Sequence, residues 1–278
     1  MPIATRHCPL DHWRHLLAAA ALVLGGVTAV KAEEIRIGGT GSALGTMRLL
    51  GAAFAKSHPD IKITVLPSMG SGGGIKAVLA GAVQLAVSSR PLTESEVKAG
   101  AVEFEYGRTP LVFATGPKNA AVDLSTQNLI DIYAGKTEQW PDGSKIRLVL
   151  RPIGDGDSEL IANIAPAMRE AKNLAEQRKG MAFSVTDQDA ADNIETIPGA
   201  VGPSSLAQII TEKRQLKALS LNGVAPDAKA LADGSYPLQK PLSIVSSPKS
   251  PAAAQAFVAF VRSAAGREIL LQTGHWVK

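Results

Sequence analysis

Cysteine is nearly missing from this chain: the only one is Cys8, and residues 33–278 contain none. That absence excludes disulfide bonds, thiolate metal sites and cysteine nucleophiles from this part of the protein. Cys8 also lies before an apolar run instead of directly after it, so a lipid-anchoring signal is not predicted. Aromatic residues make up only 4% of the chain, so a large core must consist of Ala, Val, Leu and Ile.

An excess of either charge is also lacking. Without residues 1–32, the chain keeps 26 of its 29 Lys and Arg and 24 of its 25 Asp and Glu, a net charge of +2. No basic run or patch is evident that could bind a polyanion. The sequence therefore predicts no nucleic-acid partner and no binding to an acidic membrane surface.

Motifs for catalysis and cofactor binding are missing as well. After residue 32 the histidines are His58 and His275, which lack ligand spacing and are predicted to lie at the surface. Asp155 and Asp157 resemble a fragment of a cation loop, but the rest of an EF-hand pattern is absent. No G-x-S-x-G elbow, dinucleotide G-x-G-x-x-G or P-loop occurs. We therefore predict no metal site, no cofactor and no enzyme activity.

The N-terminus has the layout of a secretory signal peptide. Arg6, Arg14 and His15 precede an uncharged apolar run at residues 16–30, and Val30-Lys31-Ala32 places small residues around a cleavage site. The run is too short for a membrane span, which needs about 20 residues. We predict that residues 1–32 are cleaved, and that the mature protein is soluble in the periplasm without direct membrane insertion.

The remaining sequence alternates strand and helix patterns. Predicted strands cover residues 34–37, 61–66, 83–87, 109–115, 146–150, 218–221 and 241–246. Predicted helices cover residues 47–56, 75–80, 124–133, 159–178, 206–212 and 252–264, with Ser125 as an N-cap and a break at Pro166 left open. This alternation predicts an α/β fold with a parallel sheet, whose ligands bind at the carboxyl ends of the strands.

Two glycine-rich segments follow the first two predicted strands. Residues 38–46 read GGTGSALGT, and residues 69–74 read MGSGGG. Each is predicted to be a loop that leads into a helix, where free backbone N–H groups and the helix dipole favour an anion. Ser88 and Ser89 follow the third strand and add hydroxyl donors at the same edge. The sequence therefore predicts an anion site at this edge of the sheet.

Longer segments resemble the phosphate-binding protein family of ABC importers. They are GSGGGIKAVLAG at 70–81, SSRPL at 88–92, LIDIYAGKTEQWPDG at 129–143, PGAVGPSSLA at 198–207, YPLQKPLSIV at 236–245 and AFVAFVRSAAGREILLQTG at 256–274. The resemblance implies a two-lobed type II periplasmic binding protein fold (PBP-like domain) with mixed, mostly parallel sheets and two hinge crossovers. It implies lobe 1 at residues 33–112 plus 240–278, lobe 2 at 113–239, and crossing strands near 111–115 and 241–245.

The same resemblance implies which residues hold the ligand. Carried over by motif, these are Ser42, Ala43, Leu44, Ser71, Ser89, Arg151, Asp155, Gly156 and Asp157. Arg151 is the strongest candidate among them, because it ends a predicted strand and a guanidinium can contact an oxyanion with two parallel hydrogen bonds. For Arg90 two roles stay open, a pair across the cleft and a contact that holds the lobe interface.

Two departures from the family pattern bear on the ligand. The family often carries Asp where this chain has Ser89, and it usually reads D-G-S-G-T where this chain reads I-G-D-G-D after Arg151 and Pro152. A carboxylate that faces a dianion is unfavourable unless the ligand supplies protons. Either one of Asp155 and Asp157 replaces the missing acceptor while the other turns outward, or the ligand is an anion other than phosphate.

The function implied by the resemblance is capture of a small oxyanion, with phosphate as the leading candidate. The partner is then the membrane permease of an ABC importer, and we expect the protein to act as a monomer. Two alternatives stay open. One is a ligand-sensing or scaffold module on the same fold, and the other is a phosphatase-like enzyme.

Overall fold

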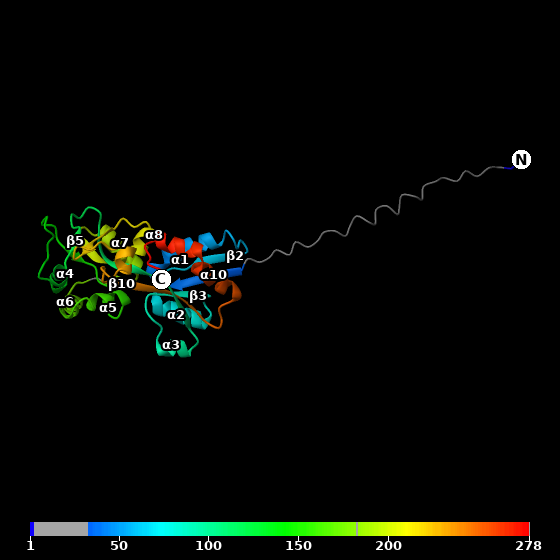
Figure 1. The fold of residues 1–278 in the computed structure, drawn as a ribbon, viewed down its shortest axis with the longest axis horizontal. Helices are drawn as coiled ribbons and strands as arrows, with labels where there is room; N and C mark the ends of the chain where they lie inside the picture. Colours follow the sequence, from blue (N-terminus) through cyan, green and yellow to red (C-terminus); the bar gives the residue numbers. More distant parts are fainter. Residues whose placement is uncertain (3–32, 182, 278) are drawn as a thin grey trace. The chain divides into compact units, whose positions relative to one another are not determined.

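The computed structural model of the chain describes residues 1–2, 33–181 and 183–277, so the predicted signal peptide lies outside the described residues except for residues 1–2. From residue 33 onward, strands and helices alternate (Figure 1). The strands are β1 (Glu33–Gly39), β2 (Ile61–Val65), β3 (Leu85–Ser88), β4 (Val102–Thr115), β5 (Asp123–Leu124), β6 (Arg147–Leu148), β7 (Ala200–Ser205), β8 (Lys217–Ala218), β9 (Ser220–Leu221) and β10 (Gln239–Ser246). The helices are α1 (Gly41–Phe54), α2 (Gly70–Ala80), α3 (Glu94–Lys98), α4 (Thr126–Ala134), α5 (Gly156–Ala162), α6 (Pro166–Gln177), α7 (Asp187–Thr196), α8 (Leu206–Thr211), α9 (Ala228–Ala232), α10 (Ala252–Arg262) and α11 (Ala264–Gln272).

The main sheet is mixed, as expected. Its strand order is β2-β1-β3-β10-β4-β7-β6, with β8 paired to β4, while β5 and β9 form a small separate sheet. The outer pairs are parallel, namely β1 with β2 and β3, and β6 with β7. The inner strand β10 is antiparallel to β3 and β4, and β4 is antiparallel to β7. The carboxyl ends of the parallel strands β1, β2 and β3 therefore lie at one edge.

Strands β4 and β10 run side by side through the middle of the sheet. The first part of β4 pairs with β10 over residues 102–110, and its last part pairs with β7 over residues 111–115. The sequence pattern predicted only residues 109–115 as a strand and missed the alternation of apolar and acidic residues at 102–106. Whether these strands act as hinges between lobes with the predicted boundaries stays a prediction.

Buried side chains gather in separate clusters on the two faces of the sheet. Successive strand residues point to opposite faces, so Leu85 and Val87 pack with α1 and α10 while Ala86 packs with α2. Figure 1 shows α1 and α10 on one side of these strands and α2 on the other.

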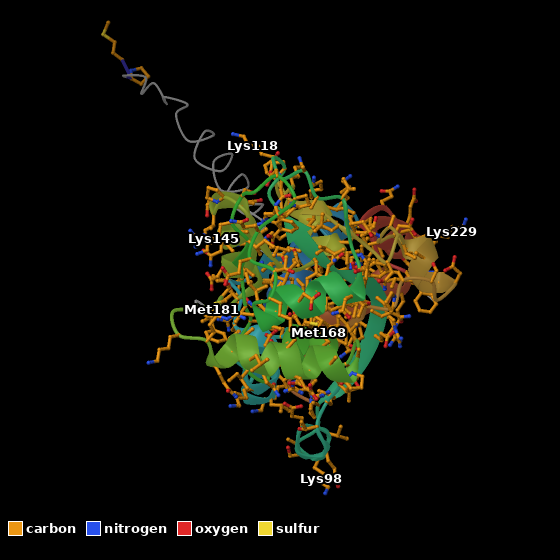
Figure 2. All side chains as sticks on the ribbon, turned by 90° about the vertical axis from the view of Figure 1, so that its left-hand side faces the viewer. Lys98, Lys118, Lys145, Met168, Met181 and Lys229 are labelled. Carbon is orange, nitrogen blue, oxygen red and sulfur yellow. The ribbon has the colours of Figure 1, made fainter. Side chains whose placement is uncertain are left out.

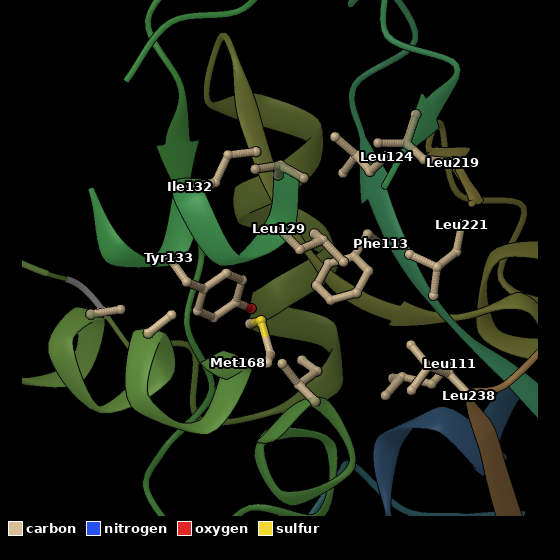
Figure 3. Close-up of a cluster of buried hydrophobic side chains, with 14 of the residues drawn as sticks. Leu111, Phe113, Leu124, Leu129, Ile132, Tyr133, Met168, Leu219, Leu221 and Leu238 are labelled. Atoms are coloured by element: carbon tan, nitrogen blue, oxygen red, sulfur yellow. The ribbon is translucent and has the colours of Figure 1, made fainter. Parts of the chain in front are cut away.

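The last part of β4 alternates in the same way. Leu111 and Phe113 enter one cluster, and Val112 and Ala114 enter another. In the first of these, Phe113 meets Tyr133 edge-on at 6.4 Å between ring centroids, beside residues of α4 and α6 (Figure 3). The core therefore consists mainly of aliphatic side chains, as the composition predicted, with a few aromatic rings among them.

Within the two glycine-rich segments, residues 41–46 and 70–74 are helical, which corrects the loop prediction. Helix α1 begins at Gly41 instead of residue 47, and α2 begins at Gly70 instead of residue 75. Tertiary packing overrides the low helix propensity of glycine here. A Cβ at Gly74 would lie 2.7 Å from Gly39 Cα, so the absent side chain lets α2 pack directly on the end of β1.

Other helix boundaries follow local chemistry. Ser125 caps α4 as predicted, since its hydroxyl accepts a hydrogen bond from the Asn128 amide at 3.0 Å. The predicted long helix from residue 159 is broken, and α6 starts at Pro166, where a missing N–H is harmless. The pattern analysis gave no helix for the segments that form α3, α7, α9 and α11.

His275 is buried, so the prediction that it lies at the surface is wrong. Its side chain has 0% exposure and packs against Tyr106 at 5.7 Å between ring centroids. Burial lowers the pKa of His275 to about 4, against hydrogen bonds with Leu270 and Thr273 that act in the opposite direction. His58 is half-buried and stacks on Phe54 at 4.1 Å.

The surface carries charged side chains in separate places. Lys98, Lys118, Lys145 and Lys229 lie apart at the periphery of the view in Figure 2. Within the part of the chain that the structure describes, no helix is long and apolar enough to cross a membrane.

Candidate functional site

A cavity of about 220 Å³ lies where the carboxyl ends of β1, β2 and β3 face the segments that precede α5 and α7. It is lined by Thr40, Ser68, Gly70, Ser71, Gly72, Ser89, Arg90, Arg151, Gly154, Asp155, Gly156, Asp157, Val185, Thr186, Asp187 and Lys240. The two sides come close, because a Cβ at Gly156 would lie 3.9 Å from Ser89 Oγ. The sequence prediction that the strand ends gather at one edge is therefore confirmed.

A chain of hydroxyl groups forms one wall of the cavity. Ser71 Oγ lies 3.3 Å from Ser89 Oγ and accepts a hydrogen bond from the Ser89 amide at 3.0 Å. Ser89 Oγ lies 3.3 Å from Thr40 Oγ1, which lies 3.2 Å from Ser42 Oγ. Each hydroxyl can donate or accept, so this chain can turn its protons toward an anion.

Arg151 also lines the cavity and is only 5% exposed. Its Nη2 and Nε donate to the Asp155 carboxylate at 3.0 and 3.3 Å, and its Nη1 donates to the Ser184 carbonyl at 2.8 Å. Burial disfavours the guanidinium charge, but nearby Asp187, Asp155 and Asp157 outweigh burial and raise the pKa of Arg151. The guanidinium therefore stays charged, and Asp155 and the Ser184 carbonyl hold it in place.

Lys240 is a buried cation at the base of the cavity, at 2% exposure. Its Nζ lies 2.6 Å from Asp157 Oδ1 and 3.0 Å from Asp187 Oδ1. Burial lowers the pKa of Lys240, and the two carboxylates outweigh it, so the net direction is upward. Burial raises the pKa of Asp157, although Lys240 acts against this.

Asp187 lies at the start of α7 and also reaches the start of α1. Its carboxylate accepts a hydrogen bond from Thr40 Oγ1 at 3.4 Å, and the nearby Ser42 amide also helps to lower the pKa of Asp187. Burial opposes its charge, but Lys240, Arg151 and these contacts lower the pKa of Asp187 to about 2. The carboxylate is therefore ionised at neutral pH.

Charged side chains of both signs line the cavity in the described part of the chain. Arg90 lines the cavity, but its guanidinium is paired with Glu96 of α3 at 2.7 and 2.9 Å. Neither of the two roles left open for Arg90 is seen, because this pairing is with α3, which follows Arg90 directly in the chain. The pairing also lowers the pKa of Glu96 to about 2. Without that pair, the lining holds the cations Arg151 and Lys240 and the carboxylates of Asp155, Asp157 and Asp187.

The structure brings most of the predicted residues together. Ser71, Ser89, Arg151, Asp155, Gly156 and Asp157 all line the cavity. Ser42, Ala43 and Leu44 do not line it: they form the buried first turn of α1 behind Asp187. The expectation that one aspartate turns outward has a mixed outcome, because Asp155 is partly exposed and pairs with Arg151, while Asp157 is buried and pairs with Lys240.

Sequence reasoning missed Lys240 and Asp187. Lys240 lies inside a strand-like segment, and a lysine there is expected to point to solvent. Asp187 had a usable signal: the TDQD stretch at 186–189 is a capping box, in which Thr186 Oγ1 accepts from the Asp189 amide at 3.0 Å. That box marks a further helix start, and only the fold shows that it lies at the cavity.

The donors in the cavity suit an oxyanion better than a metal. Within the described residues, no group of three or more His, Cys, Asp or Glu side chains is arranged to hold a metal ion. The three carboxylates of the cavity are instead engaged by Arg151, Lys240 and the start of α1.

Comparison with known proteins gives a consistent picture. The chain matches the family described as PBP superfamily domain over residues 26–265. It is 31% identical over 225 residues to the phosphate-binding protein PstS of Bacillus subtilis (strain 168). The aligned region covers 76% of this chain and 70% of that protein. Identity to the phosphate-binding protein PstS of Borreliella burgdorferi is 23% over 248 residues, covering 86% and 88% of the two chains.

Solved structures share the fold. A substrate-binding protein assigned to a phosphate ABC transporter of Clostridium perfringens, with bound phosphate, has a TM-score of 0.74 and 22% identity, and 88% of this chain and 100% of that chain are covered. An ABC-type phosphate transport receptor from Vibrio cholerae has a TM-score of 0.58 and 21% identity, with the same coverage of 88% and 100%.

Proposed function

The chain belongs to the phosphate-binding protein family of the PBP superfamily, and on that premise we propose that it captures phosphate outside the cytoplasm for an ABC importer. The observation that carries this proposal is the position of Arg151. Its buried guanidinium group belongs to a residue that lines the same cavity as Ser71, Ser89 and Thr40. A guanidinium and several hydroxyl donors around a cavity of this size match the acceptor oxygens of a small tetrahedral anion.

The mode of action follows from this arrangement. Residues 33–112 with 240–278 form one lobe and residues 113–239 form the other, joined through β4 and β10. Ligand donors come from both, with Ser71 and Ser89 on the first and Arg151 on the second. Closure of the lobes around phosphate then presents a joint surface to the membrane permease. The protein acts as a monomer, after a signal peptide at residues 1–32 directs it to the periplasm.

Ligand contacts include the remaining members of the predicted set. Gly156 and Asp157 begin α5 and lie opposite Ser89. Asp155 orients Arg151 and caps α5, since its Oδ1 accepts from the Asp157 amide at 3.0 Å. Ser42, Ala43 and Leu44 contribute through the first turn of α1, once Asp187 no longer covers it. The family is one of substrate-binding proteins, so capture and release need no covalent step.

A second candidate function has one specific observation in its favour. Three N–H groups of Arg151 are already used by Asp155 and the Ser184 carbonyl, which leaves fewer donors for a ligand. A ligand-sensing or scaffold module would tolerate an arginine whose hydrogen bonds are made within the protein. Calorimetry separates the two, because such a module without a ligand gives no heat with phosphate.

The test is titration calorimetry of the mature protein with phosphate and with sulfate. We expect phosphate binding, and we expect Arg151→Ala to weaken it by about a hundredfold or more, since charge-assisted hydrogen bonds carry about 1.5–3 kcal/mol each. Arg147→Ala is the matched control, because this arginine is exposed on nearby β6. Thermal unfolding of both variants reports whether the fold is kept. Unchanged phosphate affinity in a folded Arg151→Ala protein would contradict the proposed site.

A further inference from the structure

The carboxylate of Asp187 is held the way an anionic ligand is held. It accepts a hydrogen bond from the hydroxyl of Thr40 at 3.4 Å, and the amide of Ser42, in the first turn of α1, is close enough to favour its charge. It also pairs with Lys240 at 3.0 Å. An amide at a helix start, a hydroxyl and an ammonium group are the donors that an oxyanion would use.

This contact joins parts of the chain that are far apart in sequence. Asp187 and Gln188 begin α7, and both reach the first turn of α1, where Gln188 Nε2 donates to the Gly41 carbonyl at 3.1 Å. A Cβ at Gly41 would lie 2.8 Å from Asp187 Oδ2 and 2.2 Å from Gln188 Oε1. The missing side chain of Gly41 therefore allows this close approach.

The same contact closes off the start of α1. Ser42, Ala43 and Leu44 have 0%, 0% and 1% exposure, and none of them lines the cavity. Thr40 lines the cavity but shares its hydroxyl with Asp187. A second anion cannot use these donors while the carboxylate occupies them, because two like charges would then share one set of hydrogen bonds.

We propose that Asp187 is a built-in competitor of the ligand, whose carboxylate occupies the donors of α1 and Lys240 until phosphate displaces it. The inference rests on the proposed function. Displacement frees Thr40, the α1 amides and one side of Lys240 for the ligand, and it releases the start of α7 from α1. Asp187 thus sets the affinity of the protein for phosphate and links binding to a movement of α7.

An opposite role has the opposite signature. If Asp187 instead accepted a proton of the bound anion, its removal would weaken binding.

The experiment measures phosphate affinity by calorimetry in the full mature protein and in Asp187→Asn and Asp187→Ala. The first variant removes the charge and keeps the shape, and the second also empties the space. Asp189→Asn on the same helix is the control, because this side chain is exposed and caps α7 without reaching α1.

We expect both Asp187 variants to bind phosphate about tenfold or more tightly than the parent protein, since they lose a charge-assisted competitor. Asp189→Asn is expected to leave the affinity within about twofold. Equal or weaker binding in a folded Asp187→Asn protein overturns the inference. If Asp187→Ala does not fold, Asp187→Asn still decides the sign, because its amide keeps the packing and Lys240 keeps Asp157.

A second measurement separates displacement from a plain change of charge. In the parent protein, addition of phosphate must shift the backbone amide resonance of Ser42, with the same dissociation constant that calorimetry gives. A silent Ser42 amide at saturation means that Asp187 stays in place, and this overturns the inference.

The outcomes for the two proposals are distinguishable. If the parent protein binds phosphate and the Asp187 variants bind more weakly, the proposed function stands and the inference fails. If only the variants bind, the competitor is real and the parent protein is not a phosphate receptor. If none of them binds, both proposals fail.

Discussion

Replacement of Lys240 by methionine would remove the cation that lies between two buried carboxylates. Lys240 is 2% exposed, and its Nζ lies 2.6 Å from Asp157 and 3.0 Å from Asp187. Methionine has a similar length without the charge, so packing changes little. The variant thus isolates the electrostatic part of the interaction.

The expected loss of folding stability is large. Removing one partner of a buried ion pair costs about 3–5 kcal/mol, because the remaining charge stays buried without a counterion. Arg151 also stabilises the Asp187 charge, so the lower end, about 3 kcal/mol, is the expected value. For a chain of this size, that corresponds to a drop in melting temperature of about 6–12 °C.

The assay is urea unfolding of the mature protein at neutral pH, with the midpoint and slope determined separately. The slope is expected to stay the same while the midpoint falls. Lys62→Met is the control, since Lys62 is exposed and lies 3.7 Å from Glu34; its effect is expected to stay within about 0.5 kcal/mol. Adding Asp157→Asn and Asp187→Asn to Lys240→Met removes the unpaired charges and is expected to recover most of the loss.

The effect has a defined pH dependence. In the parent protein the pKa of Asp187 is about 2 against its ordinary value of 3.8, so its ionised form contributes about 2 kcal/mol above pH 3.8. That contribution disappears as the pH falls from 3.8 toward 2. The gap between parent and Lys240→Met must therefore be widest near neutral pH and shrink in acid. A loss below about 1 kcal/mol at neutral pH, or a gap that widens in acid, would refute the electrostatic reasoning.

Two further predictions concern residues away from the cluster. Burial lowers the pKa of His275 to about 4 from its ordinary 6.5, so the folded protein favours the neutral imidazole. The free energy of unfolding must therefore fall by about 3 kcal/mol as the pH drops from 6.5 to 4. Urea midpoints across this range should fall less in His275→Gln, and an equal fall in both proteins would contradict the assignment. Gly74→Ala should destabilise the protein by about 1–3 kcal/mol, because the added Cβ would lie 2.7 Å from Gly39 Cα. Gly72→Ala on the same helix should be neutral or stabilising, because its Cβ would meet only Arg90 Nη2 at 3.7 Å. Thermal melts compare the two variants directly, and equal losses of stability would count against the packing argument.

Local patterns predicted those elements in which one physical signal dominates. The cap at Ser125 was predicted and is present, and the break at Pro166, which the sequence left open, is present as well. The starts of α1 and α2 were placed too late, since glycine has low helix propensity. In the fold, Gly41 at the start of α1 packs against Asp187 and Gln188, and Gly74 of α2 packs on Gly39. The sequence pattern indicates that these glycines are parts of loops, whereas in the structure their lack of a side chain allows close packing.

Part of the candidate site could also be read from the chain. Ser71, Ser89 and Arg151 each follow a predicted strand or begin a predicted helix, and the rule that such ends share one edge places them together. The order of elements along the sequence is enough for that conclusion. It says where side chains gather and leaves open which of them pair.

The amino-acid sequence by itself determined the α/β class, the family, the edge at which the site forms and most of its lining, because these depend on periodicity, caps and motifs that are local in the chain. Only the tertiary structure decided the charge of the site. Lys240 meets Asp157 and Asp187 across sequence separations of 83 and 53 residues, and Asp187 covers the start of α1 from 147 residues away at Thr40. Ion pairs of this kind depend on distances between elements, which no local pattern encodes.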